Sequence, residues 1–284
     1  MFKYYTFTEY AVTNILNNEL YMNHYESFND PFECWCSIST GFPSIEDTSS
    51  RMEDIFKAWG FDSLDDPDAN ENYALYTESI IGTEPDVMGV IDHARITCFS
   101  KRPDNLLMWS HYANGLRGFC LEFDPHLVLF NNPNFAEIYE VNYQANPPEI
   151  DTAVLAVVMD QINYHSYALE DVSCDNEAEP YENALDASLS HSKDIYKKML
   201  ATKPLDWKYE EELRIIYQSS CNKKSAQFLK YPPQAIKSVI FGEKMPDKQR
   251  HALKALFESN IRDIEFKVAK RTKGSFQVTL ENGI

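Results

Sequence analysis

The most constraining stretch of this chain is Trp-Lys-Tyr-Glu-Glu-Glu-Leu-Arg-Ile-Ile at residues 207–216, which ends in β-branched residues typical of a strand. Side chains two residues apart share one face of a strand, so Glu210, Glu212 and Arg214 are expected to stand in a row. Leu213 is expected on the opposite face. Two carboxylates and a guanidinium beside a buried strand indicate either a solvated sheet edge, where such pairs add little stability, or a functional site.

The balance of charges limits the partners of this chain. Its 284 residues include 44 acidic and 26 basic side chains, a formal net charge of -18. Phosphate groups are bound by concentrated Lys and Arg, so this composition argues against a protein that binds bare nucleic acid or an anionic membrane surface. A small neutral or cationic ligand and a basic protein target are both compatible with it.

Several absences lead us to expect a cytoplasmic protein. No segment reaches the roughly 18 uninterrupted apolar residues of a membrane span, and the N-terminal residues lack the apolar run of a secretory signal. The six cysteines do not have the spacing of a zinc finger or ribbon, so we expect reduced and mostly buried thiols. The sequence also lacks the glycine-rich, P-loop, zincin and hydrolase motifs of common enzyme classes.

The order of the expected elements favours an α+β fold with a mixed or antiparallel central sheet and flanking helices, because strands and helices do not alternate regularly. Strands are expected at 20–22, 94–100, 117–124, 137–143, 209–217, 227–231, 235–242, 261–268 and 275–280. Helices are expected after Thr8 and at 44–60, 105–113 and 246–259. We expect one domain over residues 1–284, with a helical insertion at 149–203 and with strand 227–231 beside strand 209–217.

A rigid corner is expected at Asn-Asp-Pro-Phe-Glu, residues 29–33. Asp30 suits the capping position of a helix, and Pro31 suits the first helical position. This structural role accounts for the side chains of the segment, although its two acids could also reach a pocket.

Several motifs occur in order between residue 3 and about residue 245, and together they resemble the bacterial family called domain of unknown function 2971. The motifs are Lys3-Tyr4, Phe-Asn-Asp-Pro-Phe-Glu at 28–33, Cys-Phe-Ser at 98–100, Met-Trp-Ser-His-Tyr at 108–112, residues 118–124 and residues 207–214. The family name carries no activity, so the resemblance constrains the fold more than the function.

A second resemblance is to the ADP-ribosyltransferase fold. Enzymes of that superfamily place an Arg or His on an early strand, a Ser or Tyr on a middle strand and a Glu, in one class Glu-x-Glu, on a late strand. Ser100 followed by Glu210-x-Glu212 fits this order. The chain departs from it in having Lys, Tyr and Tyr at residues 3–5 in place of Arg or His, and in the long gap after Ser100.

This second resemblance implies roles for individual residues. Glu212 is expected to stabilise a ribosyl centre that becomes cationic, and Glu210 to steer an incoming nucleophile. The remaining substrate-binding candidates are Tyr4, Tyr5, Ser100, His111, Tyr112 and Arg214. Trp109 is expected in the core, whereas His111 and Tyr112 could line an aromatic wall for a nicotinamide or adenine ring. No metal is required.

The hypothesis that follows is an ADP-ribosyltransferase-like enzyme that cleaves the nicotinamide–ribose bond of NAD, with a macromolecule or water as acceptor. By analogy with such folds it could serve as a toxin or in phage defence. One alternative is a metal-dependent nuclease in which Glu210, Glu212, Asp30 and Glu122 hold Mg²⁺. Another is a binding module whose acidic surface recognises a basic partner and whose aromatic helix binds a peptide or a small ligand.

Overall fold

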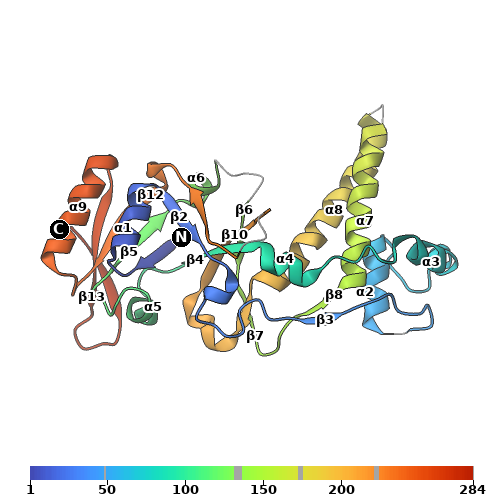
Figure 1. Ribbon diagram of the computed structural model, residues 1–284, viewed down its shortest axis with the longest axis horizontal. Coiled ribbons are helices and arrows are strands. Elements are labelled where there is room, and N and C mark those ends of the chain that lie inside the picture. The colour runs from blue at the N-terminus through green and yellow to red at the C-terminus, as the bar shows by residue number, and fades with distance from the viewer. Residues whose placement is uncertain (48, 131–135, 172–174, 221–223, 284) are drawn as a thin grey trace. The chain divides into compact units, whose positions relative to one another are not determined.

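The computed structural model describes residues 1–47, 49–130, 136–171, 175–220 and 224–283 (Figure 1). The chain divides into two compact units. The first unit contains Met1–Glu33, Asp92–Ala145 and Lys203–Ile284, and the second contains Cys34–Ile91 and Asn146–Thr202. The second unit therefore includes the expected helical insertion and also residues 34–91, which the sequence did not assign to it.

An eight-stranded sheet forms the framework of the first unit. Its strands lie in the order β14-β13-β12-β5-β1-β4-β10-β6, and neighbours run antiparallel except for the parallel pair β12–β13. The expected α+β fold with a mixed sheet is confirmed. The strands are β1 (Phe2–Tyr5), β4 (Ala94–Ser100), β5 (Phe119–Phe123), β6 (Ala136–Glu140), β10 (Glu212–Gln218), β12 (Ile236–Gly242), β13 (Glu265–Arg271) and β14 (Val278–Asn282).

Helices and short strands flank this sheet in the same unit. The helices are α1 (Glu9–Leu16), η1 (Tyr25–Ser27), α5 (Leu106–His111), α6 (Pro125–Phe130), η2 (Leu205–Glu210), η3 (Pro233–Ala235) and α9 (Asp247–Asn260). The short strands are β2 (Glu19–Met22), β7 (Asn142–Gln144), most of β9 (Thr202–Pro204) and β11 (Gln227–Lys230). Thr8 caps α1 as expected, because its side chain accepts a hydrogen bond from the backbone N–H of Ala11.

Alternation along the strands gives the sheet two buried faces. On β5, Phe119, Leu121 and Phe123 belong to one core cluster, which also receives apolar residues of α1, α6 and α9. Cys120 between them belongs to a second cluster on the other face, together with Trp109 of α5. Helices on both faces remove apolar strand residues from water, which is the main stabilising contribution in a fold of this type.

The same alternation positions the polar end of β10. Its Cα register pairs Glu212 with Ser100 at the end of β4, and Ser100 in turn pairs with Phe2 on β1. Leu213 packs against the first core cluster, so Glu212 stands on the opposite face, as the two-residue period predicts. The ends of three central strands therefore meet here, and β4 and β10 bring the polar residues Ser100 and Glu212 to this point.

Three local predictions are wrong. Residues 209–211 do not continue the strand: η2 ends at Glu210, and Glu211 has a left-handed backbone with φ of 42° that redirects the chain before β10 begins. Strand β11 pairs with β2 and not with β10. Asp30 caps no helix, because residues 31–34 form only a turn, in which the Asp30 carboxylate accepts a hydrogen bond from the backbone N–H of Phe32.

The second unit is mainly helical. It contains β3 (Ser37–Ser39), α2 (Ser50–Trp59), α3 (Pro67–Ile80), most of α4 (Val87–His93), β8 (Glu149–Asp151), α7 (Thr152–Asp171) and α8 (Asp175–Leu200). The parallel pair β3–β8 and an ion pair between Arg51 and Asp151 join its two chain segments. No helix in the described part of the chain is long and apolar enough to cross a membrane.

Candidate functional site

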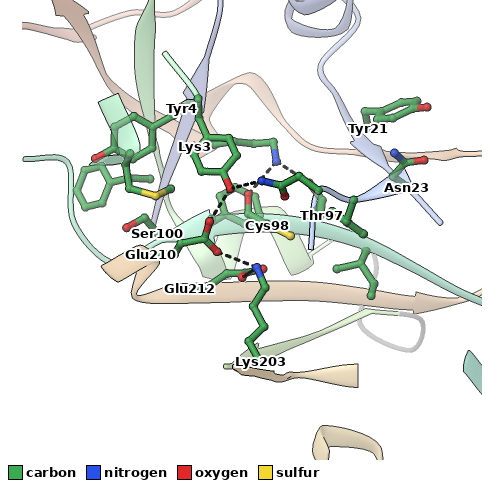
Figure 2. A pocket seen from close by; sticks show the side chains of 17 residues that line it. Lys3, Tyr4, Tyr21, Asn23, Thr97, Cys98, Ser100, Lys203, Glu210 and Glu212 are labelled. Atoms are coloured by element: carbon green, nitrogen blue, oxygen red, sulfur yellow. Dashed lines mark hydrogen bonds and ion pairs between the residues drawn. The ribbon is translucent and has the colours of Figure 1, made fainter. Parts of the chain in front are cut away.

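A cavity of about 240 Å³ opens in the first unit beside the polar edge formed by β1, β4 and β10 (Figure 2). Its walls are largely aromatic and apolar. Those residues include Phe2, Tyr4, Tyr21, Phe28, Met108 and Tyr112. The polar groups that reach it include Lys3, Asn23, Asn29, Thr97, Ser100, Lys203, Glu210 and Glu212. Apolar walls with a few convergent polar groups are characteristic of small-molecule sites.

Lys203, on β9, is the centre of a buried charge network. Its Nζ lies 2.8 Å from Oε2 of Glu210 and 2.8 Å from Oε2 of Glu212. Oε2 of Glu33 lies 3.9 Å away. Burial opposes the charge of this amine, but the surrounding carboxylates outweigh burial and raise the pKa of Lys203 above its usual range. In Figure 2, Lys203 approaches Glu210 and Glu212 from one side, while Lys3 and Tyr4 lie on the other.

Both carboxylate oxygens of Glu212 are bound within this network. One carboxylate oxygen accepts a hydrogen bond from Arg214 Nε at 2.9 Å, and the other accepts one from Lys203. Its backbone N–H donates to the hydroxyl of Tyr143 at 2.8 Å. Burial alone would raise the pKa of Glu212, but the charges of Arg214 and Lys203 outweigh it and lower the pKa to about 2. Glu212 therefore stays ionised.

Glu210 has a different environment although it shares Lys203 with Glu212. Its Oε1 accepts a hydrogen bond from the Tyr112 hydroxyl at 2.5 Å, and its Oε2 is bound by Lys203. Burial raises the pKa of Glu210, and Lys203 offsets this effect only in part. Two carboxylates whose pKa values move in opposite directions are a recurrent arrangement at sites of acid–base chemistry.

Arg214 completes the network behind the cavity. Its Nη1 lies 2.5 Å from Oε1 of Glu33, and its Nε binds Glu212. With every group ionised, three carboxylates and two cations give the network a net charge of −1. Of the three carboxylates, Glu210 is the one that Arg214 does not bind, and it faces the cavity.

Two further polar groups stand on the strands that line the cavity. The Lys3 amine donates to Oγ1 of Thr97 and to the carbonyl oxygen of Cys98, both at 2.8 Å. Burial lowers the pKa of Lys3. The Ser100 hydroxyl oxygen accepts a hydrogen bond from the backbone N–H of Arg102 at 3.2 Å, which leaves its proton available for another acceptor.

The structure brings together five of the eight residues selected from the sequence. Those lining the cavity are Tyr4, Ser100, Tyr112, Glu210 and Glu212. Tyr5 lies outside it, because it faces the other side of β1 and stacks on Phe119. His111 is exposed and contacts the rings of Tyr112 and Tyr209. Arg214 is buried and binds carboxylates of the protein itself, so a substrate does not meet it directly.

Sequence reasoning missed Lys203, Glu33 and Tyr143 as members of this site. Lys203 lies in the three-residue strand β9, directly after the long helix α8, and no motif surrounds it. Glu33 had a signal, because it ends the Asn-Asp-Pro-Phe-Glu segment, but the sequence favoured a structural role in a turn for that segment. Its burial against Arg214 depends on pairing over a long sequence distance, which a local pattern does not encode.

The four carboxylates considered as Mg²⁺ ligands do not form a metal site. Glu122 accepts a hydrogen bond from the Ser238 hydroxyl at 2.6 Å on another part of the sheet, and Lys203 lies between Glu210 and Glu212. Across the described ranges, no group of three or more His, Cys, Asp or Glu side chains could hold a metal ion.

A comparison with protein families gives one match, to the family described as protein of unknown function (DUF2971), over residues 108–215. The resemblance to this family is confirmed. The matched segment begins at the Met-Trp-Ser-His-Tyr motif and ends within β10, so it contains Tyr112, Lys203, Glu210 and Glu212. No curated protein and no solved structure matches the chain.

Proposed function

We propose that the chain cleaves the nicotinamide–ribose bond of NAD and passes the ADP-ribosyl group to water or to a macromolecule. The observation that carries this proposal is the Glu210 carboxylate, which faces an aromatic-lined cavity from a buried network of net charge −1. A cationic ring or a ribosyl centre that becomes cationic would offset this negative charge, because charges interact strongly where water is excluded.

The proposed reaction is a heterolytic substitution at C1′ of the ribose. The bond from C1′ to the pyridinium nitrogen breaks, its electron pair stays with nitrogen, and nicotinamide leaves as a neutral molecule. The hydroxyl oxygen of the acceptor forms the new bond to C1′. Its proton passes to the Glu210 carboxylate, for which a raised pKa is favourable.

The geometry favours Glu210 for the role that the sequence assigned to Glu212. Both oxygens of Glu212 are occupied by Arg214 and Lys203, so this carboxylate holds the network together. Both oxygens of Glu210 are also bound, by Tyr112 and Lys203, but Glu210 has no guanidinium partner in the network. Burial raises its pKa, whereas the pKa of Glu212 is lowered, so Glu210 is the better acceptor of a proton. We therefore assign the contact with the reacting centre to Glu210 and the positioning of Lys203 to Glu212.

The size of the cavity limits how much of NAD it would hold. Its volume of about 240 Å³ is below the roughly 300–1,000 Å³ of sites for drug-sized ligands. We propose that it receives the nicotinamide ring and its ribose, with the adenosine part outside. The Lys3 amine and the Ser100 hydroxyl are the donors available for the carboxamide or for ribose hydroxyls.

The test is release of nicotinamide from NAD by the purified protein, compared among wild type, Glu210→Gln and Glu211→Gln. Glu210→Gln is expected to lower the rate by about 10²–10³, the cost of removing one preorganised electrostatic group. Glu211 is the matched control, because it is the next residue along the chain and pairs at the surface with Arg102. Absence of release by wild-type protein, or equal loss in both variants, would contradict the proposal.

A further inference from the structure

The two units of the chain divide its charge very unevenly. The second unit contains 23 acidic and 5 basic residues, whereas the first contains 21 of each. The whole formal net charge of -18 therefore belongs to the second unit, which has fewer than half of the residues. A field of one sign attracts partners of the opposite sign and accelerates their association.

Helix α7 of this unit combines a buried half with an exposed aromatic face. Residues 152–158 are all buried, partly against α2. Beyond them, Tyr164 and Tyr167 are 57% and 68% exposed. They are three residues apart, so they share one face of the helix. Glu170 and Asp171, which are also exposed, follow them in the last turn.

Exposed tyrosines beside carboxylates have a characteristic partner chemistry. A guanidinium stacks on an aromatic ring and also binds carboxylates through its planar set of donors. Tyr is among the residues enriched at protein interfaces, where it contributes much of the binding energy. A nucleic acid or an anionic membrane would be repelled by the charge of this unit.

We propose that the face of α7 that carries Tyr164 and Tyr167 is a docking surface for an arginine-rich protein segment. The charge of the second unit attracts the segment, and the two rings with the neighbouring carboxylates hold its guanidinium groups. This interaction requires no NAD and no residue of the cavity, so it stands independently of the proposed reaction.

The probe is a fluorescent peptide in which arginine alternates with serine, titrated with the full chain at an ionic strength of about 0.15 M and followed by fluorescence anisotropy. Saturable binding is expected, and it should weaken as salt is added. A peptide with glutamate in place of arginine and a single-stranded oligonucleotide serve as comparisons. Stronger binding of either one, or no binding of the arginine peptide, would overturn the proposal.

A pair of substitutions separates docking on this face from general attraction to an acidic protein. The double variant Tyr164→Ser/Tyr167→Ser keeps every charge and is expected to weaken binding about 5-fold to 30-fold, the loss of two cation–π contacts. Phe276→Ser is the control, because this ring is 97% exposed and belongs to the first unit, whose formal net charge is zero. Equal affinity of the double variant and wild type would overturn the proposal, as would an equal loss in the control.

Glu210→Gln distinguishes this interaction from the proposed reaction. The variant is expected to bind the peptide as wild type does, because Glu210 belongs to the first unit and not to the unit that carries α7. The tyrosine variant is expected to keep α7 intact, because both replaced side chains are at the surface. Circular dichroism checks that its helix content equals that of wild type. Loss of binding in Glu210→Gln with the fold intact would place the peptide in the cavity and would contradict docking on α7.

Discussion

The two units of this chain use the same charged residue types in opposite ways. Among the residues that the structure describes, every buried Asp, Glu, Lys or Arg belongs to the first unit, including the network around Lys203. The second unit has the excess of 18 negative charges, and those of its charged side chains that the structure describes lie at or near the surface. Buried charges must be paired to be tolerated, and they fix geometry, whereas exposed charges of one sign repel one another and act at a distance.

The largest expected effect comes from breaking the buried network at its centre. Lys203→Met keeps the aliphatic volume but leaves Glu210 and Glu212 without their shared cation. We expect a loss of about 3–5 kcal/mol in the free energy of unfolding, the usual cost of removing one partner of a buried ion pair. Urea denaturation of both proteins measures it.

Lys208→Met is the control for this prediction, because Lys208 is exposed and lies only five residues further along the chain. Its stability should stay within about 0.5 kcal/mol of wild type. If Lys203→Met were as stable as wild type, the network would not need its cation, and the contrast between the two units would lose its basis.

Lowering the pH should decrease the stability of the first unit and increase that of the second. The pKa of Glu212 is lowered to about 2 from its usual value of 4.5. Its contribution to stability is therefore present above pH 4.5 and is lost as the pH falls toward 2, up to about 3 kcal/mol. Glu210 offsets part of this loss, because its pKa is raised by burial. The second unit should gain stability over the same range as its repulsion is neutralised.

Fluorine NMR of 5-fluorotryptophan protein can follow both units in one sample. Trp109 and Trp207 report on the first unit, and Trp35 and Trp59 on the second. On acidification, the first pair should show unfolding at lower urea concentration while the second pair does not. If the second pair responded first, the assignment of the acid-sensitive charges to the first unit would be wrong.

The sequence predicted the regular parts of the fold because they follow from local patterns. Alternation placed Leu213 and Glu212 on opposite faces of β10, and the mixed order of elements gave the α+β class. The error at Glu210 has a local cause. Glu211 adopts a left-handed backbone that is uncommon for this residue type, and no glycine or asparagine marks the break in the sequence.

The candidate site was predictable only in part, for a physical reason. Glu210 and Glu212 could be selected from their two-residue spacing before an apolar strand, and Ser100 from its place at the end of a strand expected to be buried. Lys203 and Glu33 could not, because their roles come from pairing between segments far apart in the sequence. Pairing of this kind depends on the whole sheet, and a window of neighbouring residues does not contain it.

The smallest predicted effect concerns salt, and it tests the second half of the comparison directly. Like charges three or four residues apart on a helix cost about 0.2–0.5 kcal/mol per pair, and salt screens them. Such pairs in the second unit include Asp68–Glu71 in α3 and Glu179–Glu182 and Glu182–Asp186 in α8. Together they should give a gain on the order of 1 kcal/mol when sodium chloride is added. The network around Lys203 is buried and therefore screened much less. Urea midpoints followed at Trp59 should rise with salt while those at Trp109 stay nearly constant. Parallel rises at both positions would point to a general salt effect on burial, and the unequal division of charge would then have no consequence for stability.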